Sequence, residues 1–202
     1  MSHLQTSEQA VLQLARKHPL LRARDLAREG LPTIALTRLV SAGKLERVGR
    51  GIYSLPNQAV SENRSLAEVA IRVPRGVICL VSALRVHDIG TQAPHEIWLA
   101  IPHRMLSPRL DKPALRVIRM SGPSLTEGID RLKVDGVEVS VFNAAKTIAD
   151  CFKFRNKIGL DVALEALKNA RAQRKASADD LWHFAKICRV ANVMRPYLEA
   201  IG

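Results

Sequence analysis

The chain has 202 residues, of which 47% are hydrophobic and 4% aromatic, and 31 Lys and Arg against 19 Asp and Glu give a net charge of +12. That length accommodates one large or two small domains, and no apolar run approaches the roughly 20 residues of a membrane span. The absence of a secretory signal at the N-terminus and the three dispersed cysteines predict a cytoplasmic protein without disulfides, bound metal or cofactor, whose basic surface attracts polyanions.

The first 30 residues predict two short helices separated by a strand. Thr6 or Ser7 is suited to cap the first helix, and Pro19 ends it because the residue before a proline is driven out of helical conformation. Residues 20–22 are expected to form a short strand and residues 23–29 a second helix.

Residues 31–55 predict a third helix followed by a two-stranded hairpin. Pro32 suits the first turn of the helix, and Gly43 suits its end because glycine adopts the left-handed cap conformation. The apolar positions Leu36 and Leu39 lie three residues apart on one face. The turn at residues 49–51 contains two glycines, which accept a positive φ. This succession is typical of a winged helix-turn-helix.

The face of the third helix opposite its apolar stripe carries hydroxyl and cationic side chains, and the hairpin that follows carries two more cations. These are the side-chain types that contact base edges and phosphates in DNA. The predicted DNA-binding residues are Thr33, Thr37, Arg38, Ser41, Lys44, Arg47 and Arg50. Each feature alone is typical of a solvated helix or an ordinary turn, but their succession favours a complex with double-stranded DNA.

The remainder predicts strands followed by helices. Residues 56–61 are the expected linker. The expected strands are residues 76–81, 96–101 and 115–120, and a hairpin whose turn is Asp135-Gly136. The expected helices are residues 61–73, 83–89 with Ser82 as cap, 144–154, 160–172, 178–190 and 193–201. The predicted fold class is therefore α+β. A winged helix-turn-helix domain at residues 1–58 is followed by a mixed α+β domain at residues 59–202 that ends in a helical bundle.

Two stretches of the chain, residues 30–56 and residues 139–152 followed by 159–164, resemble the AbiEi-type antitoxins of type IV toxin–antitoxin and abortive-infection phage-defence systems. Residues 81–84 with His87 are also similar to the middle segment of that family. The resemblance implies that the winged helix represses its own operon by binding inverted repeats in the promoter, as a monomer or dimer. It also implies that residues 59–202 are needed for antitoxin action. The implied partner is a nucleotidyltransferase-like toxin, which the antitoxin need not contact.

The resemblance also points to a possible antitoxin-domain motif at Lys146, Thr147 and Asp150. The family often has Pro-Glu-Arg-Thr before this aspartate, whereas this chain has Ala-Ala-Lys-Thr, and lysine lacks the bidentate fork of arginine. Lys146 and Asp150 are four residues apart on one helix, so an ion pair on a solvated face is the default expectation. Because Asp150 lies between Ile148 and Cys151-Phe152, it could instead be partly buried and orient the helix.

Three other functions stay open at this stage. Residues 59–202 could bind a toxin or another partner while the winged helix is only a scaffold. The protein could instead be a stand-alone regulator of similar build. An enzyme is the least favoured: Asp135 and Glu138 suggest a metal-dependent nuclease, but no lysine follows at the spacing that common nucleases use.

Overall fold

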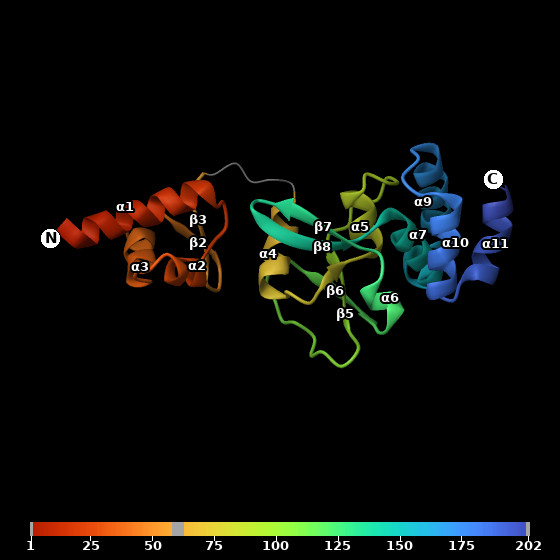
Figure 1. Cartoon of the computed structure of the whole chain (residues 1–202), viewed down its shortest axis with the longest axis horizontal. Coiled ribbons are helices and arrows are strands. Elements are labelled where there is room, and N and C mark those ends of the chain that lie inside the picture. The colour runs from red at the N-terminus through yellow and green to blue at the C-terminus, as the bar shows by residue number, and fades with distance from the viewer. Residues whose placement is uncertain (1, 58–62, 201–202) are drawn as a thin grey trace. The chain divides into compact units, whose positions relative to one another are not determined.

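The computed structural model describes residues 2–57 and 63–200, and the chain divides into two compact units (Figure 1). One comprises residues 1–71 with 133–138, and the other comprises residues 72–132 with 139–202. The domain boundary predicted after residue 58, and residues 58–61 of the predicted linker, lie outside the described residues, so this boundary stays a prediction. None of the helices in the described ranges is long and apolar enough to cross a membrane.

The N-terminal unit combines helices with a small antiparallel sheet. Its elements are α1 (Ser2–Lys17), β1 (Leu21–Arg22), α2 (Ala23–Arg28), α3 (Ile34–Ser41), β2 (Glu46–Gly49), β3 (Ile52–Ser54) and α4 (Arg64–Arg72). Strand β3 lies between β1 and β2, with Leu21 opposite Tyr53 and Arg47 also opposite Tyr53. The short strand predicted at residues 20–22 is therefore present as β1. The core of this unit is formed by buried aliphatic residues of α1, α2 and α3, together with Leu21 and Leu45.

One prediction for this unit is wrong. Helix α1 begins at Ser2, so Thr6 and Ser7 lie inside the helix and do not cap it. The apolar spacing that predicted the helix is set by residues such as Val11 and Ala15, both fully buried. It does not fix the first turn, because no proline or glycine interrupts the helix before Thr6.

The C-terminal unit is built on a five-stranded mixed sheet in the order β6-β5-β4-β8-β7, of which only residues 133–138, the facing ends of β7 and β8 with their turn, belong to the first unit. Its strands are β4 (Val77–Ile78), β5 (Ile97–Pro102), β6 (Leu115–Met120), β7 (Ile129–Val134) and β8 (Val137–Phe142). Strands β5 and β6 are parallel, as are β4 and β8, whereas β4 and β5 are antiparallel. The residues joining β7 to β8, Asp135 and Gly136, both have positive φ, at +47° and +78°. This is the geometry that Asp-Gly favours in a tight hairpin.

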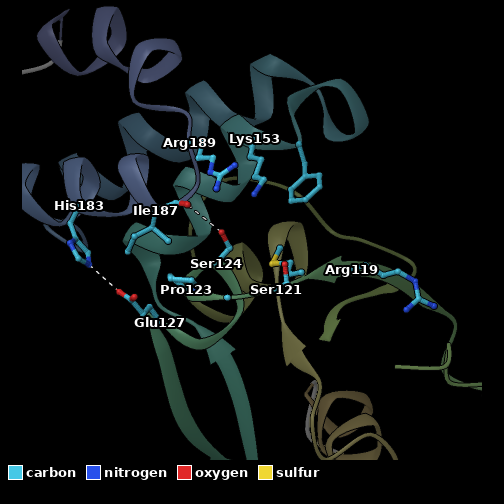
Figure 2. Close-up of a pocket in the computed structure, with 12 residues that line it drawn as sticks. Arg119, Ser121, Pro123, Ser124, Glu127, Lys153, His183, Ile187 and Arg189 are labelled. Carbon is cyan, nitrogen blue, oxygen red and sulfur yellow. Dashed lines mark hydrogen bonds and ion pairs between the residues drawn. The ribbon is translucent and has the colours of Figure 1, made fainter. Parts of the chain in front are cut away.

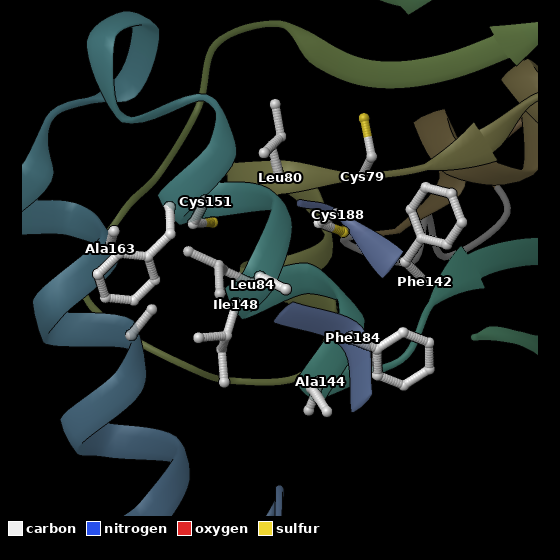
Figure 3. Close-up of a cluster of buried hydrophobic side chains, with 14 of the residues drawn as sticks. Cys79, Leu80, Leu84, Phe142, Ala144, Ile148, Cys151, Ala163, Phe184 and Cys188 are labelled. Carbon is white, nitrogen blue, oxygen red and sulfur yellow. The ribbon is translucent and has the colours of Figure 1, made fainter. Parts of the chain in front are cut away.

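Seven helices complete the described part of this unit: α5 (Leu80–Val86), α6 (Pro123–Thr126), α7 (Ala144–Lys153), α8 (Arg155–Ile158), α9 (Leu160–Ala172), α10 (Ala178–Ile187) and α11 (Ala191–Ala200). Helix α7 is the central one, since residues 144–152 are all buried and α5, α9, α10 and α11 pack against it (Figures 1 and 3). The aliphatic and aromatic side chains around it form the core of the unit. The predicted α+β class is confirmed at this level.

The segment at residues 76–81 differs from the prediction. Only Val77 and Ile78 pair in the sheet, and α5 already begins at Leu80. Ser82 is therefore inside the helix and not at its cap. Its buried hydroxyl accepts a hydrogen bond from the Trp98 backbone N–H (3.0 Å) and donates to the Glu96 carbonyl (3.4 Å), so it ties α5 to β5. A continuous apolar run has no period that separates a strand from a buried helix.

Candidate nucleic-acid interface

Helix α3 has one buried face and one face in solvent. Thr33 occupies the N-cap position, while Ala35, Leu36 and Leu39 point into the core of the N-terminal unit. Gly43 follows the helix with φ of +66°, a conformation that costs glycine little. The side chains between the buried positions are consequently directed away from the core.

All seven predicted DNA-binding residues are exposed. Five belong to α3 or its two ends, and two belong to β2 and the following turn: Thr33, Thr37, Arg38, Ser41 and Lys44, then Arg47 and Arg50. Arg47 donates from Nε to the Gly49 carbonyl (3.3 Å). Within the described residues, the side chains of Arg38, Lys44 and Arg50 have no hydrogen-bond or ion-pair partner. Such cations can bind an external anion without first breaking an internal contact.

Helix α3 and the residues next to it carry no carboxylate; Glu29 precedes them in the sequence, and the nearby Asp25 and Glu46 accept hydrogen bonds. Residues 30–45 contain no Asp or Glu. Asp25 accepts hydrogen bonds from Nε (2.7 Å) and Nη2 (2.8 Å) of Arg22. Burial alone would raise the pKa of Asp25, but the Arg22 hydrogen bonds outweigh it and hold the pKa below its usual value. Glu46 accepts a hydrogen bond from Ser54 Oγ (3.2 Å).

Ile34 is an exposed residue that the sequence reasoning missed. It is the first residue of α3, and its side chain is 53% exposed although isoleucine is usually buried. The signal was present in the sequence, because Ile34 falls outside the stripe formed by Leu36, Leu39 and Val40. It places an apolar group in solvent one helical turn before Thr37 and Arg38.

The Lys146–Asp150 pair is not on a solvated face, so the default expectation is wrong, whereas the alternative of a buried Asp150 agrees with the structure. Both side chains are 0% exposed, and Nζ of Lys146 donates to Oδ2 of Asp150. The ammonium also lies 4.0 Å from the centroid of the Phe142 ring, a cation–π contact. The i, i+4 spacing did indicate the ion pair, but residues 144–152 of α7 are all buried, so the pair cannot lie on a solvated face.

The second carboxylate oxygen of Asp150 is also engaged. The Cys188 thiol at the end of α10 donates to Oδ1 (3.2 Å), so the carboxylate connects α7 to α10. Burial raises the pKa of Asp150, and the interactions with Lys146 only partly oppose this effect. Burial also raises the pKa of the Cys188 thiol to about 12. Thr147 donates its hydroxyl to the Phe142 carbonyl (3.1 Å). The three motif residues therefore hold α7 in place.

No group of three or more His, Cys, Asp or Glu within the described ranges could hold a metal ion. The three cysteines there are buried free thiols.

Residues 9–56 match the family model described as "Transcriptional regulator, AbiEi antitoxin". The AbiEi segment, as we call residues 9–56, spans most of α1 and all of β1, α2, α3, β2 and β3. It contains Ile34 and the seven predicted DNA-binding residues. The sequence-based resemblance is confirmed for this part of the chain, whereas Lys146, Thr147 and Asp150 lie outside it.

Comparison with solved structures extends the fold similarity beyond the AbiEi segment. The crystal structure of the RV2827C protein from Mycobacterium tuberculosis matches with a TM-score of 0.62 at 16% sequence identity. The match covers 90% of this chain and 71% of that chain. A comparison with curated proteins finds no match. At this identity the similarity concerns the fold alone.

Proposed function

We propose that the AbiEi segment forms a winged helix-turn-helix that binds double-stranded promoter DNA, and that the protein is a sequence-specific cytoplasmic repressor. The observation that carries this proposal is the exposed, carboxylate-free face of α3, on which Arg38 and Lys44 have no partner among the described residues. A net charge of +12 adds long-range attraction to a polyanion.

The proposed complex assigns different roles to the two parts of the interface. Helix α3 enters the major groove, where Arg38 bonds a guanine edge and Thr37 and Ser41 contact bases or phosphates. Lys44 and Arg50 bind phosphates, and Arg47 does so through its terminal nitrogens because Nε is already bonded to Gly49. Thr33 lies at the N-cap of α3, where its hydroxyl makes no cap hydrogen bond and is free for a phosphate.

Ile34 adds an apolar contact to this interface. The 5-methyl group of thymine is the apolar feature of the major groove, and apolar side chains recognise it. An isoleucine that is 53% exposed at the start of α3 fits this role. Replacing thymine by deoxyuridine in the DNA removes the methyl group and should weaken binding of the parent but not of Ile34→Ala.

We further propose that the protein is the antitoxin of a type IV toxin–antitoxin system and represses its own operon. The support is the match of residues 9–56 to antitoxin transcriptional regulators. Inverted repeats in the promoter would then bind two copies of the chain, one per half-site. In this scheme residues 59–202 counter a nucleotidyltransferase-like toxin, and co-expression with the adjacent gene tests that part separately.

A gel-shift titration on the protein's own upstream DNA, at two or more salt concentrations, tests the DNA-binding proposal. Arg50→Ala should weaken binding to every sequence and reduce the salt slope by about one unit. The matched control is Lys168→Ala, which removes an exposed cation from α9 in the other unit and should leave the slope unchanged. Absence of binding by the parent, together with co-purification of a neighbouring gene product, would favour a protein-interaction module instead.

A further inference from the structure

The C-terminal unit contains a cleft that the proposed DNA-binding function does not use. Its volume is about 570 Å³, within the range typical of small-molecule sites. One wall is the segment from Met120 through α6, and the other is formed by the end of α7 and by α10 with the residue that follows its cap (Figure 2). The two walls come from distant parts of the sequence: the closest lining residues of the two, Glu127 and Lys153, are more than 25 positions apart.

The charge of the cleft is positive. Lys153 and Arg189 both line it, and both are exposed. Figure 2 shows the two side chains entering from the helical wall and directed toward the Ser121–Ser124 segment. Neither takes part in an ion pair within the described residues. The one carboxylate in the lining, Glu127, lies at the rim of the cleft with its Oε2 3.4 Å from Nε2 of His183.

A third cation, Arg119, lines the cleft but is not available to a ligand. Its guanidinium donates to the carbonyls of His103 (2.8 Å) and Met105 (2.6 Å) and to the Ser107 hydroxyl (3.0 Å). Arg119 therefore fixes the loop between β5 and β6. Lys153 and Arg189, in contrast, donate no side-chain hydrogen bond to another described residue.

Arg189 occupies a position where glycine is the usual residue. Its φ is +59°, and the Val190 N–H bonds the Ala185 carbonyl (2.8 Å), as in a Schellman cap. A side chain in this left-handed conformation is strained. The strained Arg189 and Lys153, whose Nζ lies 5.9 Å from the centroid of the Phe154 ring, both line this cleft.

We propose that this cleft binds a nucleotide, with its phosphate between Lys153 and Arg189. A phosphate monoester is a dianion and matches two cations, and the Ser121 hydroxyl adds a further polar group. The apolar part of the lining, Met120, Pro123, Phe154 and Ile187, suits a planar base rather than a bare sugar. This site is independent of the proposed DNA-binding function, since all of its residues lie in the other unit.

Isothermal titration calorimetry of the full chain with the four ribonucleoside 5′-monophosphates tests the proposal. At least one of them should bind, and the same nucleoside without phosphate should not. Lys153→Gln and Arg189→Gly should each weaken binding by about tenfold or more, because each removes a charge-assisted contact. Arg189→Gly should also raise the melting temperature, because glycine relieves the strain, so weaker binding cannot be attributed to unfolding.

Two control variants locate the binding. Lys157→Gln removes an exposed cation whose Nζ lies 5.8 Å from the Phe154 ring but which does not line the cleft, and it should bind as the parent does. The double variant Arg38→Ala/Arg50→Ala should also bind as the parent does. The proposal is overturned if no monophosphate binds at about 10 mM, if Lys153→Gln and Arg189→Gly bind like the parent, or if the Arg38/Arg50 variant loses binding.

Discussion

Removing either member of the buried Lys146–Asp150 pair should strongly destabilise the C-terminal unit. Asp150→Ala leaves an ammonium that is 0% exposed, with the Phe142 ring at 4.0 Å as its nearby partner. Lys146→Met leaves a buried carboxylate whose other hydrogen bond comes from the Cys188 thiol. Breaking a buried pair costs about 3–5 kcal/mol, a large share of the about 5–15 kcal/mol that stabilises a typical protein.

The double variant Lys146→Met/Asp150→Ala should lose less stability than the two single variants together. It has no uncompensated charge, so its cost is mainly that of imperfect packing. The expected coupling energy in the double-mutant cycle is at least about 2 kcal/mol. Urea unfolding followed by tryptophan fluorescence measures it, because Trp98 and Trp182 both lie in the C-terminal unit.

An exposed contact between a histidine and a carboxylate in the same unit provides the control. The side chains of His183 and Glu127 are 59% and 44% exposed, so Glu127→Gln should change the free energy of unfolding by less than about 1 kcal/mol. If the two single variants at Lys146 and Asp150 cost as little as this control, or if their effects simply add, the pair is not the buried, coupled unit described above.

Two further predictions concern stability. Gly128→Ala should lower the free energy of unfolding by about 1–3 kcal/mol, because Gly128 has φ of +71° and a Cβ there would lie 2.8 Å from Lys146 Cβ and from the Phe184 ring. Urea unfolding followed by tryptophan fluorescence measures this change, and a value within roughly 0.5 kcal/mol of the parent, about the error of the method, would contradict the prediction. Asp25 has a lowered pKa in the folded state, so its contact with Arg22 stabilises the N-terminal unit at pH values above its unfolded-state pKa of about 3.8. This stabilisation is lost as the pH falls through the lower pKa that Asp25 has in the folded state. NMR signals of α2 followed during acid titration should show that loss in the parent and not in Asp25→Asn, whereas identical profiles would exclude it.

The sequence predicted best those features that depend on nearby residues. The Asp135-Gly136 turn was predicted because those two residues tolerate the positive φ values that the hairpin needs. The helix at residues 160–172 was predicted with the bounds that α9 has, since its apolar positions recur at helical spacing.

Features that depend on distant residues could not be predicted. The i, i+4 spacing of Lys146 and Asp150 indicated an ion pair, and the apolar neighbours of Asp150 suggested its partial burial. The complete burial of both side chains depends on the other helices that pack around α7. The Cys188 thiol that bonds Asp150 is 38 residues away in sequence. The cleft lined by Lys153 and Arg189 likewise forms between segments that are far apart in the sequence, so no local sequence pattern predicts it.

The proposed function requires that α3 and the hairpin after it recognise a DNA sequence. The most direct measurement is the ratio of affinities, by fluorescence anisotropy at fixed salt, for the protein's upstream DNA and for a scrambled duplex of equal length and composition. The parent should prefer the upstream DNA, and Arg38→Ala should lower that preference by about 1–3 kcal/mol while binding to the scrambled duplex changes much less. Equal affinity of the parent for both duplexes, or an unchanged preference in Arg38→Ala, would contradict the claim.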